Sequence, residues 1–345
     1  MKNLPVLIET YRYGYNTNLN PELFFRGSAR KSGETTMPSQ TDWTFAGTWP
    51  YTPRWFQTPD GQLHYIDEGP RDGRPIILVH GNPTWGYIWR NFIPPLVSAG
   101  YRVIIPDHLG FGRSDKPDDP SLYHIPRHAA RLEQFLESLD LANATVVCQD
   151  WGGPIGLAWA ARHPDRVHSL AIMNTLAHRP SKQVPMPLSL RLIRYPILGE
   201  IFIKGLHAFV RLFLFRGGTM HPDRLGPNER NAYLAPHPDW ASRTGVLVFP
   251  REIPAGPDGA VSAFIGSVHD GLMAMDQKPV FIAWGMKDFA FLPAHLDELW
   301  LVDFPHAKVL RLADAGHFVQ EDAHEVIVPA LVEFLNQPED APPHC

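Results

Sequence analysis

Three side chains that together can carry out nucleophilic catalysis occur in the chain in the order Asp150, Asp288 and His317. Each follows closely on a short, largely apolar run that is typical of a buried strand. Open α/β sheets bind their ligands beyond the carboxyl ends of their parallel strands. We therefore expect the three side chains to meet there, with Asp150 as the nucleophile, His317 as the base and Asp288 holding the imidazole ring.

Asp150 lies between an apolar run at 144–147 and a segment with helical spacing of apolar residues at 154–161. A turn that leads directly from a strand into a helix strains its central residue and requires small residues two positions away on either side. Cys148 and Gly152 are small, so the pattern predicts a nucleophile elbow with Asp150 at its tip. The alternative is that Asp150 only caps the following helix, since Asp is a preferred N-cap residue. No G-x-S-x-G sequence offers a competing serine.

An aspartate at this position changes the mechanism. A carboxyl group with an ordinary pKa of about 3.9 is ionised at neutral pH, so it can displace a leaving group from carbon without a base. The product would be an ester on Asp150, and His317 would act only afterwards, by activating the water that hydrolyses this ester. We expect the backbone N–H groups of Asn82 and Trp151 to form the oxyanion hole for that hydrolysis.

Alternating strand and helix patterns over most of the chain predict an α/β fold with a mostly parallel, doubly wound sheet. The alternation stops after Asn174, where helical patches replace it, and it resumes with the apolar run at 280–284. This break predicts a helical cap inserted between two strands; an independent second domain is the less favoured alternative, because the sheet resumes afterwards. The strands are expected at residues 63–66, 76–79, 102–105, 144–147, 170–173, 280–284 and 309–312, and helices at about 87–97, 154–161 and 322–335.

The predicted organisation follows from these patterns. The N-terminal arm has no clear hydrophobic period, which favours a flexible segment, whereas Tyr11, Tyr13 and Tyr15 keep a docked arm as the alternative. The expected parts are an arm at 1–48, the first part of the core at 49–175, the cap at 176–277, the second part of the core at 278–337 and a tail at 338–345.

Composition limits the classes of function. A hydrophobic content of 44% with 19% charged residues is ordinary for a globular protein, and a net charge of −5 argues against a nucleic-acid partner. Cys148 and Cys345 make an improbable disulfide, which favours a reducing compartment. With no signal-peptide core and no apolar stretch long enough to span a membrane, we expect a soluble, cytoplasmic protein. The absence of metal-ligand spacing and of a dinucleotide glycine fingerprint predicts no cofactor.

Four segments resemble haloalkane dehalogenases of the α/β-hydrolase superfamily: HGNPTW at 80–85, DHLGFGRSD at 107–115, QDWGG at 149–153 and GHF at 316–318. The resemblance extends from about residue 49 to about residue 336 and leaves the arm unmatched. It implies hydrolysis of a small apolar haloalkane to alcohol and halide through an aspartyl ester. In that family two N–H groups bind the halide, and Trp151 and Asn82 match their positions. The alternatives are that Trp151 only packs under the cap and that Asn82 only caps a loop.

One branch of that family places its acid after the strand that here ends at Asn174, which is not a carboxylate, so Asp288 must serve. An acid at Asp288 together with Asn82 resembles the third subfamily, which also includes β-lactone decarboxylases of long-chain olefin biosynthesis. The cap segments at 194–199 and 237–243 are similar to those decarboxylases as well. Decarboxylation is therefore the alternative activity, and the subfamily resemblance and the arm hint at a homo-oligomer.

Two further alternatives remain. Epoxide hydrolases share the aspartate nucleophile, and they need cap tyrosines to protonate the opening epoxide; Tyr195 and Tyr233 are the two tyrosines of this cap. Their usual residue after His-Gly is aromatic, whereas here it is Asn82. A ligand-binding protein on an inactive hydrolase fold is disfavoured, because no position of the triad is lost.

Overall fold

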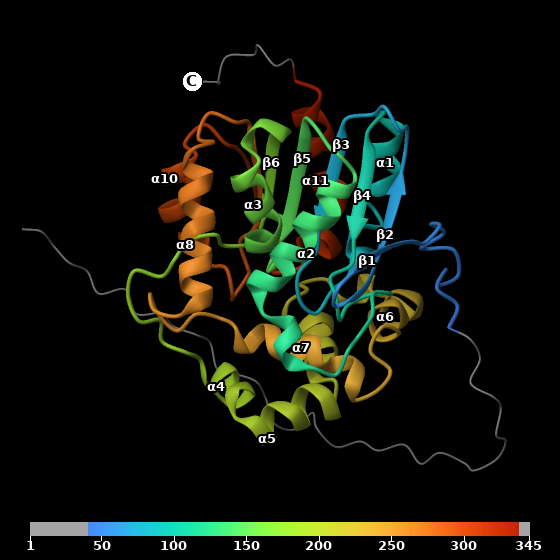
Figure 1. The fold of residues 1–345 in the computed structure, drawn as a ribbon, viewed down its shortest axis with the longest axis vertical. Helices are drawn as coiled ribbons and strands as arrows, with labels where there is room; N and C mark the ends of the chain where they lie inside the picture. The colour runs from blue at the N-terminus through green and yellow to red at the C-terminus, as the bar shows by residue number, and fades with distance from the viewer. Residues whose placement is uncertain (1–40, 338–345) are drawn as a thin grey trace, which may run out of the picture. The chain divides into compact units, whose positions relative to one another are not determined.

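The computed structural model describes residues 41–337, and these form an eight-stranded sheet with the order β1-β2-β4-β3-β5-β6-β7-β8 (Figure 1). β1 pairs antiparallel with β2, and β2 pairs antiparallel with β4, whereas all other neighbours are parallel. The predicted mostly parallel sheet is confirmed. The strands are β1 (Arg54–Thr58), β2 (Gly61–Glu68), β3 (Pro75–Val79), β4 (Arg102–Pro106), β5 (Ala144–Gln149), β6 (Val167–Met173), β7 (Val280–Gly285) and β8 (Lys308–Leu312).

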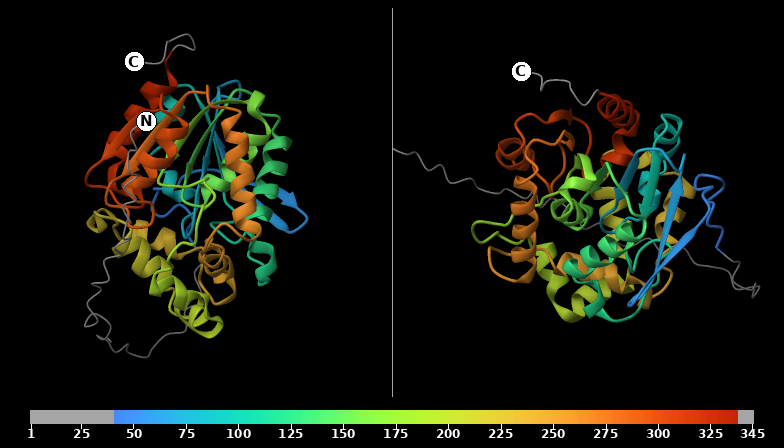
Figure 2. Two further views of the ribbon diagram at one scale, coloured as in Figure 1. Left: turned by 90° about the vertical axis from the view of Figure 1, so that its left-hand side faces the viewer. Right: turned by 45° about the horizontal axis from the view of Figure 1, so that its top comes forward.

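Helices cover both faces of the sheet, as the two further views show (Figure 2). The helices α2, α3 and α8 lie on one face and the helices α1 and α11 on the other (Figures 1 and 2). Side chains of β3 and β5 are buried on both sides, which explains why these strands are continuous apolar runs. The bounds are α1 (Ile93–Ser98), α2 (Ile125–Ser138), α3 (Gly152–Arg162), α8 (Ala260–Met273) and α11 (Val319–Leu335).

The prediction of a single helix at about 87–97 is wrong. The chain forms a short 3-10 helix, η2 (Gly86–Trp89), and then a separate helix α1. Pro94 and Pro95 cause the division, because proline lacks the N–H that a helix interior needs and fits only the first helical turn. Strand β1, at the edge of the sheet, was not predicted; it has only five residues, and of these only Thr58 is fully buried.

A helical insertion separates β6 from β7, as predicted, and it contains no strand among residues 174–279. α8 lies within the predicted cap range yet packs against α3 of the core, where a Cβ added at Gly271 would touch Ala161. The preceding elements of the insertion are α4 (Leu188–Arg194), α5 (Pro196–Gly199), η5 (Glu200–Gly205), η6 (Phe209–Gly217), η7 (Pro222–Arg224), α6 (Pro227–Leu234), η8 (Ala241–Arg243) and α7 (Thr244–Arg251).

Short elements complete the described part of the chain. They are η3 (Pro120–Tyr123), η4 (Pro164–Arg166), α9 (Pro293–His295), η9 (Leu296–Trp300) and α10 (Leu301–Asp303). Of the predicted arm, residues 1–40 lie outside the described residues, and so does the tail at 338–345. Phe45 is 3% exposed, and its ring lies 6.1 Å from that of Trp85 and 5.7 Å from that of Tyr87. Among residues 41–337, no helix combines the length and the apolar character needed to cross a bilayer.

Candidate functional site

Asp150 occupies a sharp turn between β5 and α3. Its φ angle of 52° lies in the left-handed region, which non-glycine residues seldom adopt. Two hydrogen bonds to the end of β6 hold the turn: the Asp150 N–H donates to the Asn174 carbonyl over 3.1 Å, and the Thr175 hydroxyl donates to the Asp150 carbonyl over 2.5 Å. The strand–turn–helix arrangement that the sequence predicts around Asp150 is therefore present.

The carboxylate of Asp150 does not cap α3. That helix begins at Gly152, its N-cap residue Trp151 makes no side-chain cap hydrogen bond, and Asp150 Oδ1 instead accepts a hydrogen bond of 2.7 Å from the backbone N–H of Asn82. Gly81 makes this approach possible, because a Cβ there would lie 2.3 Å from Asp150 Oδ1. Gly152 plays the same part on the other side, since its Cβ would lie 2.3 Å from the carbonyl oxygen of Val79.

The loop that carries Asn82 is fixed by a buried histidine at the end of β3. Nδ1 of His80 donates to the Gly81 carbonyl over 2.8 Å, because its Nε2 accepts the backbone N–H of His108 over 3.0 Å. Burial lowers the pKa of His80, which keeps the ring neutral and in this tautomer. The backbone donor that meets Asp150 is thus held by the core of the sheet.

His317 lies between the two carboxylates. Its Nε2 is 3.5 Å from Asp150 Oδ2, and its Nδ1 is 2.9 Å from Asp288 Oδ2. His317 is 1% exposed and Asp288 is 3% exposed, so the pair is shielded from water. Because a carboxylate only accepts hydrogen bonds, Nδ1 carries a proton. The three side chains named from the sequence are therefore brought together at the carboxyl edge of the sheet.

The charges around His317 determine its protonation in the resting protein. Burial disfavours the imidazolium ion, but the carboxylates of Asp288 and Asp150 outweigh that cost and raise the pKa of His317 to about 10. The ring is therefore a cation at neutral pH as long as both carboxylates are ionised. A resting imidazolium cannot act as a base, so any first step must proceed without one.

Asp288 is held by more than the histidine. The side-chain amide of Asn174 donates to its Oδ2 over 2.9 Å, and the backbone N–H of Ala290 donates to its Oδ1 over 2.7 Å. Asn174 also joins the backbone of Gly285, with its Oδ1 accepting an N–H over 2.7 Å. Asn174 thus directly follows β6, and its side chain positions Asp288 in the turn that follows β7.

Two further residues contact the triad without having been predicted from the sequence: Gln149 and Asn174. The Nε2 of Gln149 donates to the His317 carbonyl over 3.0 Å and lies 3.1 Å from the ring Nε2. Both residues are fully buried at the ends of strands. A buried polar residue at a strand end is the signal that could have found them, because such groups need a partner.

Trp151 follows Asp150 in the chain and Asn82 meets it through its backbone, and both residues carry a side-chain N–H donor. The indole N–H of Trp151 has no protein acceptor among the described residues, while its ring meets that of Phe249 in the cap helix α7 edge-on at 6.0 Å. The amide of Asn82 is 3% exposed; its Nδ2 reaches the Val246 carbonyl only at 3.5 Å, and its Oδ1 has no partner. Packing under the cap explains the position of the Trp151 ring but leaves its N–H available for an anion.

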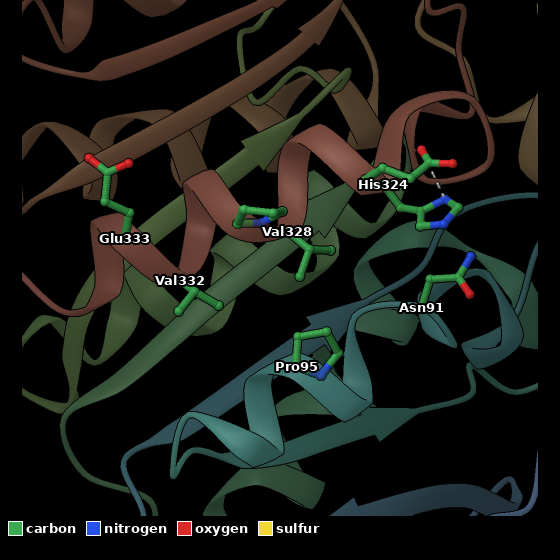
Figure 3. Close-up of a pocket in the computed structure, with 8 residues that line it drawn as sticks. Asn91, Pro95, His324, Val328, Val332 and Glu333 are labelled. Atoms are coloured by element: carbon green, nitrogen blue, oxygen red, sulfur yellow. Dashed lines mark ion pairs between the residues drawn. The ribbon is translucent and has the colours of Figure 1, made fainter.

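A surface groove and two groups of possible metal ligands lie apart from the three predicted catalytic residues in the described part of the chain. A groove of about 530 Å³ between α1 and α11 is lined mainly by apolar atoms and by residues such as Pro95 and Val328 (Figure 3). Two groups of side chains have metal-ligand types: His178 with His269 and Asp303, and Glu133 with Glu137 and His163. Neither group nor the groove contains Asp150, Asp288 or His317.

The chain is similar to known proteins over most of its length. The alpha/beta hydrolase fold family matches residues 74–324. The cis-3-alkyl-4-alkyloxetan-2-one decarboxylase of Xanthomonas campestris pv. campestris is 36% identical over 299 residues, which are 83% of this chain and 97% of the relative. The haloalkane dehalogenase of Psychrobacter cryohalolentis is 36% identical over 282 residues, which are 80% of this chain and 88% of the relative.

A solved structure agrees with these relatives. Haloalkane dehalogenase DbeA from Bradyrhizobium elkani has a TM-score of 0.75 and 30% identity, and the match covers 82% of this chain and 97% of DbeA. The fold is therefore that of the α/β hydrolases, with a helical cap, and the protein is an enzyme. Within that fold the chain belongs to the haloalkane dehalogenase family, alongside the decarboxylases of its third subfamily, which confirms the resemblance found in the sequence.

Proposed function

We propose that this enzyme hydrolyses haloalkanes to an alcohol and a halide through a covalent ester on Asp150. The observation that carries the proposal is that the two carboxylate oxygens of Asp150, at the elbow, have different hydrogen-bond partners. Oδ1 accepts a hydrogen bond from the Asn82 backbone N–H, whereas Oδ2 accepts none that meets hydrogen-bond geometry from residues 41–337 and pairs with His317 Nε2 at 3.5 Å. Oδ2 is thus the nucleophile: it forms a bond to the halogen-bearing carbon while the carbon–halogen electron pair leaves with the halide.

The leaving halide is bound by the Trp151 indole N–H and the Asn82 side-chain amide. Trp151 is the next residue after Asp150, and the backbone of Asn82 is hydrogen-bonded to the Asp150 carboxylate. The indole N–H of Trp151 has no protein acceptor among residues 41–337. Negative charge that develops on the halide is stabilised by such fixed donors more strongly in a water-poor site than in bulk water.

Hydrolysis of the ester follows from the loss of charge on Asp150. Once Oδ2 is alkylated, only Asp288 still supports the imidazolium, so the pKa of His317 falls and the ring releases its proton to solvent, which balances the charge of the departed halide. The neutral Nε2 can then accept a proton from the attacking water. The ester carbonyl is then Oδ1, which already faces the Asn82 N–H at 2.7 Å. This donor stabilises the tetrahedral oxyanion, and collapse releases the alcohol and restores the carboxylate.

Decarboxylation of a cis-β-lactone to an alkene and carbon dioxide is the second candidate. It is supported by the decarboxylases of Shewanella oneidensis and Xanthomonas campestris, which are 35% and 36% identical and are covered over 90% and 97% of their lengths. The cap segments at 194–199 and 237–243 that resemble such enzymes also support it.

The epoxide hydrolase alternative is weakened by the positions of the cap tyrosines. Tyr195 is 59% exposed, and the buried hydroxyl of Tyr233 donates to the carboxylate of Glu321. Burial and the neighbouring Glu321 raise the pKa of Tyr233 well above its usual value. Neither hydroxyl is therefore available to protonate an epoxide oxygen at Asp150.

Product analysis separates the two remaining candidates. The enzyme is incubated with 1,2-dibromoethane or 1-bromohexane, with halide release measured, and separately with a cis-β-lactone, with carbon dioxide measured. Asp150→Asn is the matched control, because the amide has nearly the same shape but is a poor nucleophile. Halide release that is lost in the control supports dehalogenation; carbon dioxide without halide supports decarboxylation. Neither product from the wild type, or equal turnover by the control, refutes the proposal.

Self-association is proposed on narrower grounds. Haloalkane dehalogenase DpaA from Paraglaciecola agarilytica is described as tetrameric and matches 85% of this chain with a TM-score of 0.72. Light scattering on the full chain at several concentrations measures the mass directly, and a mass equal to the 38.9 kDa of one chain at all of them would contradict an oligomer.

A further inference from the structure

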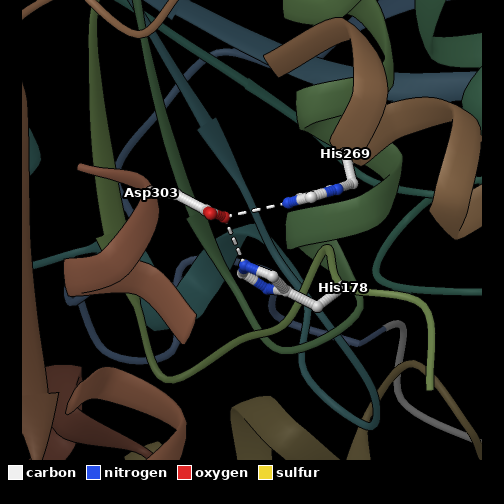
Figure 4. A group of neighbouring side chains, drawn as sticks. All are labelled: His178, His269 and Asp303. Carbon is white, nitrogen blue, oxygen red and sulfur yellow. Dashed lines mark hydrogen bonds and ion pairs between the residues drawn. The ribbon is translucent and has the colours of Figure 1, made fainter. Parts of the chain in front are cut away.

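Two histidines and one aspartate meet beside the segment that leads from β6 into the cap (Figure 4). His178 lies in that segment, His269 in α8 and Asp303 at the end of α10. The Nε2 atoms of the two rings lie 2.6 Å and 2.9 Å from the same oxygen, Oδ2 of Asp303. Residues far apart in the sequence thus bring two nitrogen ligands and one oxygen ligand to one point.

The charge at this point is not balanced. The side chain of Asp303 is 14% exposed, and no lysine or arginine among the described residues forms an ion pair with it. A largely buried carboxylate is costly without a cation, and a neutral imidazole is the form that binds metals.

We propose that His178, His269 and Asp303 bind a divalent transition-metal ion of the zinc class. Zn²⁺ takes imidazole nitrogen and carboxylate oxygen at about 2.0–2.2 Å, so tetrahedral ligands are roughly 3.3 Å apart. The present separations of 2.6 Å and 2.9 Å therefore need to open by less than 1 Å, roughly, to admit the ion. Water takes the fourth position, since the side chain of His269 is 29% exposed.

Binding requires each Nε2 to give its lone pair to the metal, which moves the ring proton to Nδ1. The Nδ1 atom of His178 can take the proton, because it is buried and has no hydrogen-bond partner in the described structure. The metal then takes the place of the two N–H donors at Oδ2 of Asp303, while the new N–H of His178 has no protein acceptor among the described residues.

The ion would act by positioning rather than by chemistry. The His178 ring packs edge-on against Trp300 at 4.7 Å, and the Trp300 indole N–H donates to the Thr175 carbonyl over 2.8 Å. Thr175 in turn holds the carbonyl of Asp150. A metal that joins the start of the cap segment to α8 and α10 would therefore stiffen the support of the elbow.

The second group of candidate ligands provides a matched control. Glu133, Glu137 and His163 also lie close together, but the guanidinium of Arg162 already pairs with the Glu133 carboxylate. A resident cation offsets one of the two carboxylates of that group and repels a divalent ion, so His163→Gln should leave metal binding unchanged. The two groups thus differ in the feature on which the proposal rests.

The experiment uses the full chain, without an affinity tag and stripped of metal by a chelator. Zn²⁺ is titrated by calorimetry, and stoichiometry is read by native mass spectrometry. We expect one ion per chain, and at about 100-fold excess over the dissociation constant a rise in Tm of about 4 °C. Co²⁺ should give the visible absorption of a four-coordinate site. His178→Gln, His269→Gln and the nearly isosteric Asp303→Asn should each weaken binding roughly 100-fold or more.

The outcomes divide clearly. Circular dichroism confirms that each variant is folded, and a variant that fails this check is replaced by the other two. No stoichiometric binding by the wild type overturns the proposal. So does binding that persists unchanged in the variants of the proposed ligands, because the ion would then be held by other histidines of the chain. Loss of binding in His163→Gln, with the three ligand variants unaffected, would assign the ion to the other group.

Discussion

Removal of the charge on Asp150 should convert His317 from a resting cation into a neutral base. Two unit charges 3.5 Å apart, the separation of His317 Nε2 and Asp150 Oδ2, interact by about 4.7 kcal/mol at an effective dielectric constant of about 20. Each tenfold change in a protonation equilibrium corresponds to about 1.36 kcal/mol. Asp150→Asn should therefore lower the pKa of His317 by about 3, from about 10 to about 7, after a small reduction for the partial exposure of Asp150.

NMR of protein labelled with ¹⁵N in its histidines measures this change directly. The ring nitrogens of His317 are followed from about pH 5 to about pH 11, which covers both expected midpoints. Asp314→Asn is the control, because Asp314 lies in the same loop but is 78% exposed and pairs with Lys287. A midpoint in Asp150→Asn within about one pH unit of the wild type would refute the electrostatic reasoning, and so would an equal change in the control.

The same pKa has a consequence for stability. Because the folded protein raises the pKa of His317 above the unfolded value of about 6.5, its contribution is complete below that pH and is lost as the pH rises towards about 10. Urea unfolding should thus show declining stability of the wild type between about pH 6.5 and about pH 10, attributable to this group, and a smaller decline in Asp150→Asn.

Three further changes probe the steps of the proposed reaction. His317→Phe should stop turnover after the first step, so mass spectrometry should find Asp150 alkylated, or acylated by a lactone; an unmodified protein would place His317 before the covalent step. Asn82→Ala or Trp151→Phe should each slow dehalogenation by about 10²–10³, more for chloride than for bromide, and equal losses for all halogens with unchanged halide affinity would exclude a halide site. Asp288→Asn should lower kcat by about 10⁴ in steady-state assays through the wrong tautomer of His317, with unchanged kcat as the contrary result.

Much of the fold follows from local patterns that survive in the folded chain. The buried strands β3 and β5 are continuous apolar runs, and the turns that follow them carry Asn82 and Asp150. Each predicted triad residue could be placed because it follows a strand of one parallel sheet, and parallel strands present their carboxyl ends on one edge. Asp150, Asp288 and His317 thus converge because each follows a strand of the same parallel sheet. This can be predicted from the order of strands and helices along the chain.

Features that depend on contacts between distant segments could not be predicted in this way. Gln149 gains its significance from the imidazole of His317, 168 residues later, and Asn174 from Asp288, 114 residues later. The two cap tyrosines could be counted in the sequence, but their availability is decided by exposure for Tyr195 and by Glu321 for Tyr233. Side-chain partners of this kind are determined by tertiary packing. The periodic spacing of hydrophobic residues in the sequence does not reveal which distant side chains will meet.

The charge on Asp150 would act in the same way for either of the two proposed kinds of substrate. Any electrophile that converts Asp150 into an ester removes the carboxylate that keeps His317 protonated, so the base appears only after the covalent step. In the proposed hydrolysis of a haloalkane, activation of water would therefore not depend on which halide has left, whereas decarboxylation of a β-lactone consumes no water. On this proposal, selectivity among haloalkanes resides in the groups proposed to bind the leaving halide, which are the indole N–H of Trp151 and the amide of Asn82. Because the backbone of Asn82 also fixes Oδ1 of Asp150, substitutions of its side chain are expected to change leaving-group preference while the nucleophile stays in place.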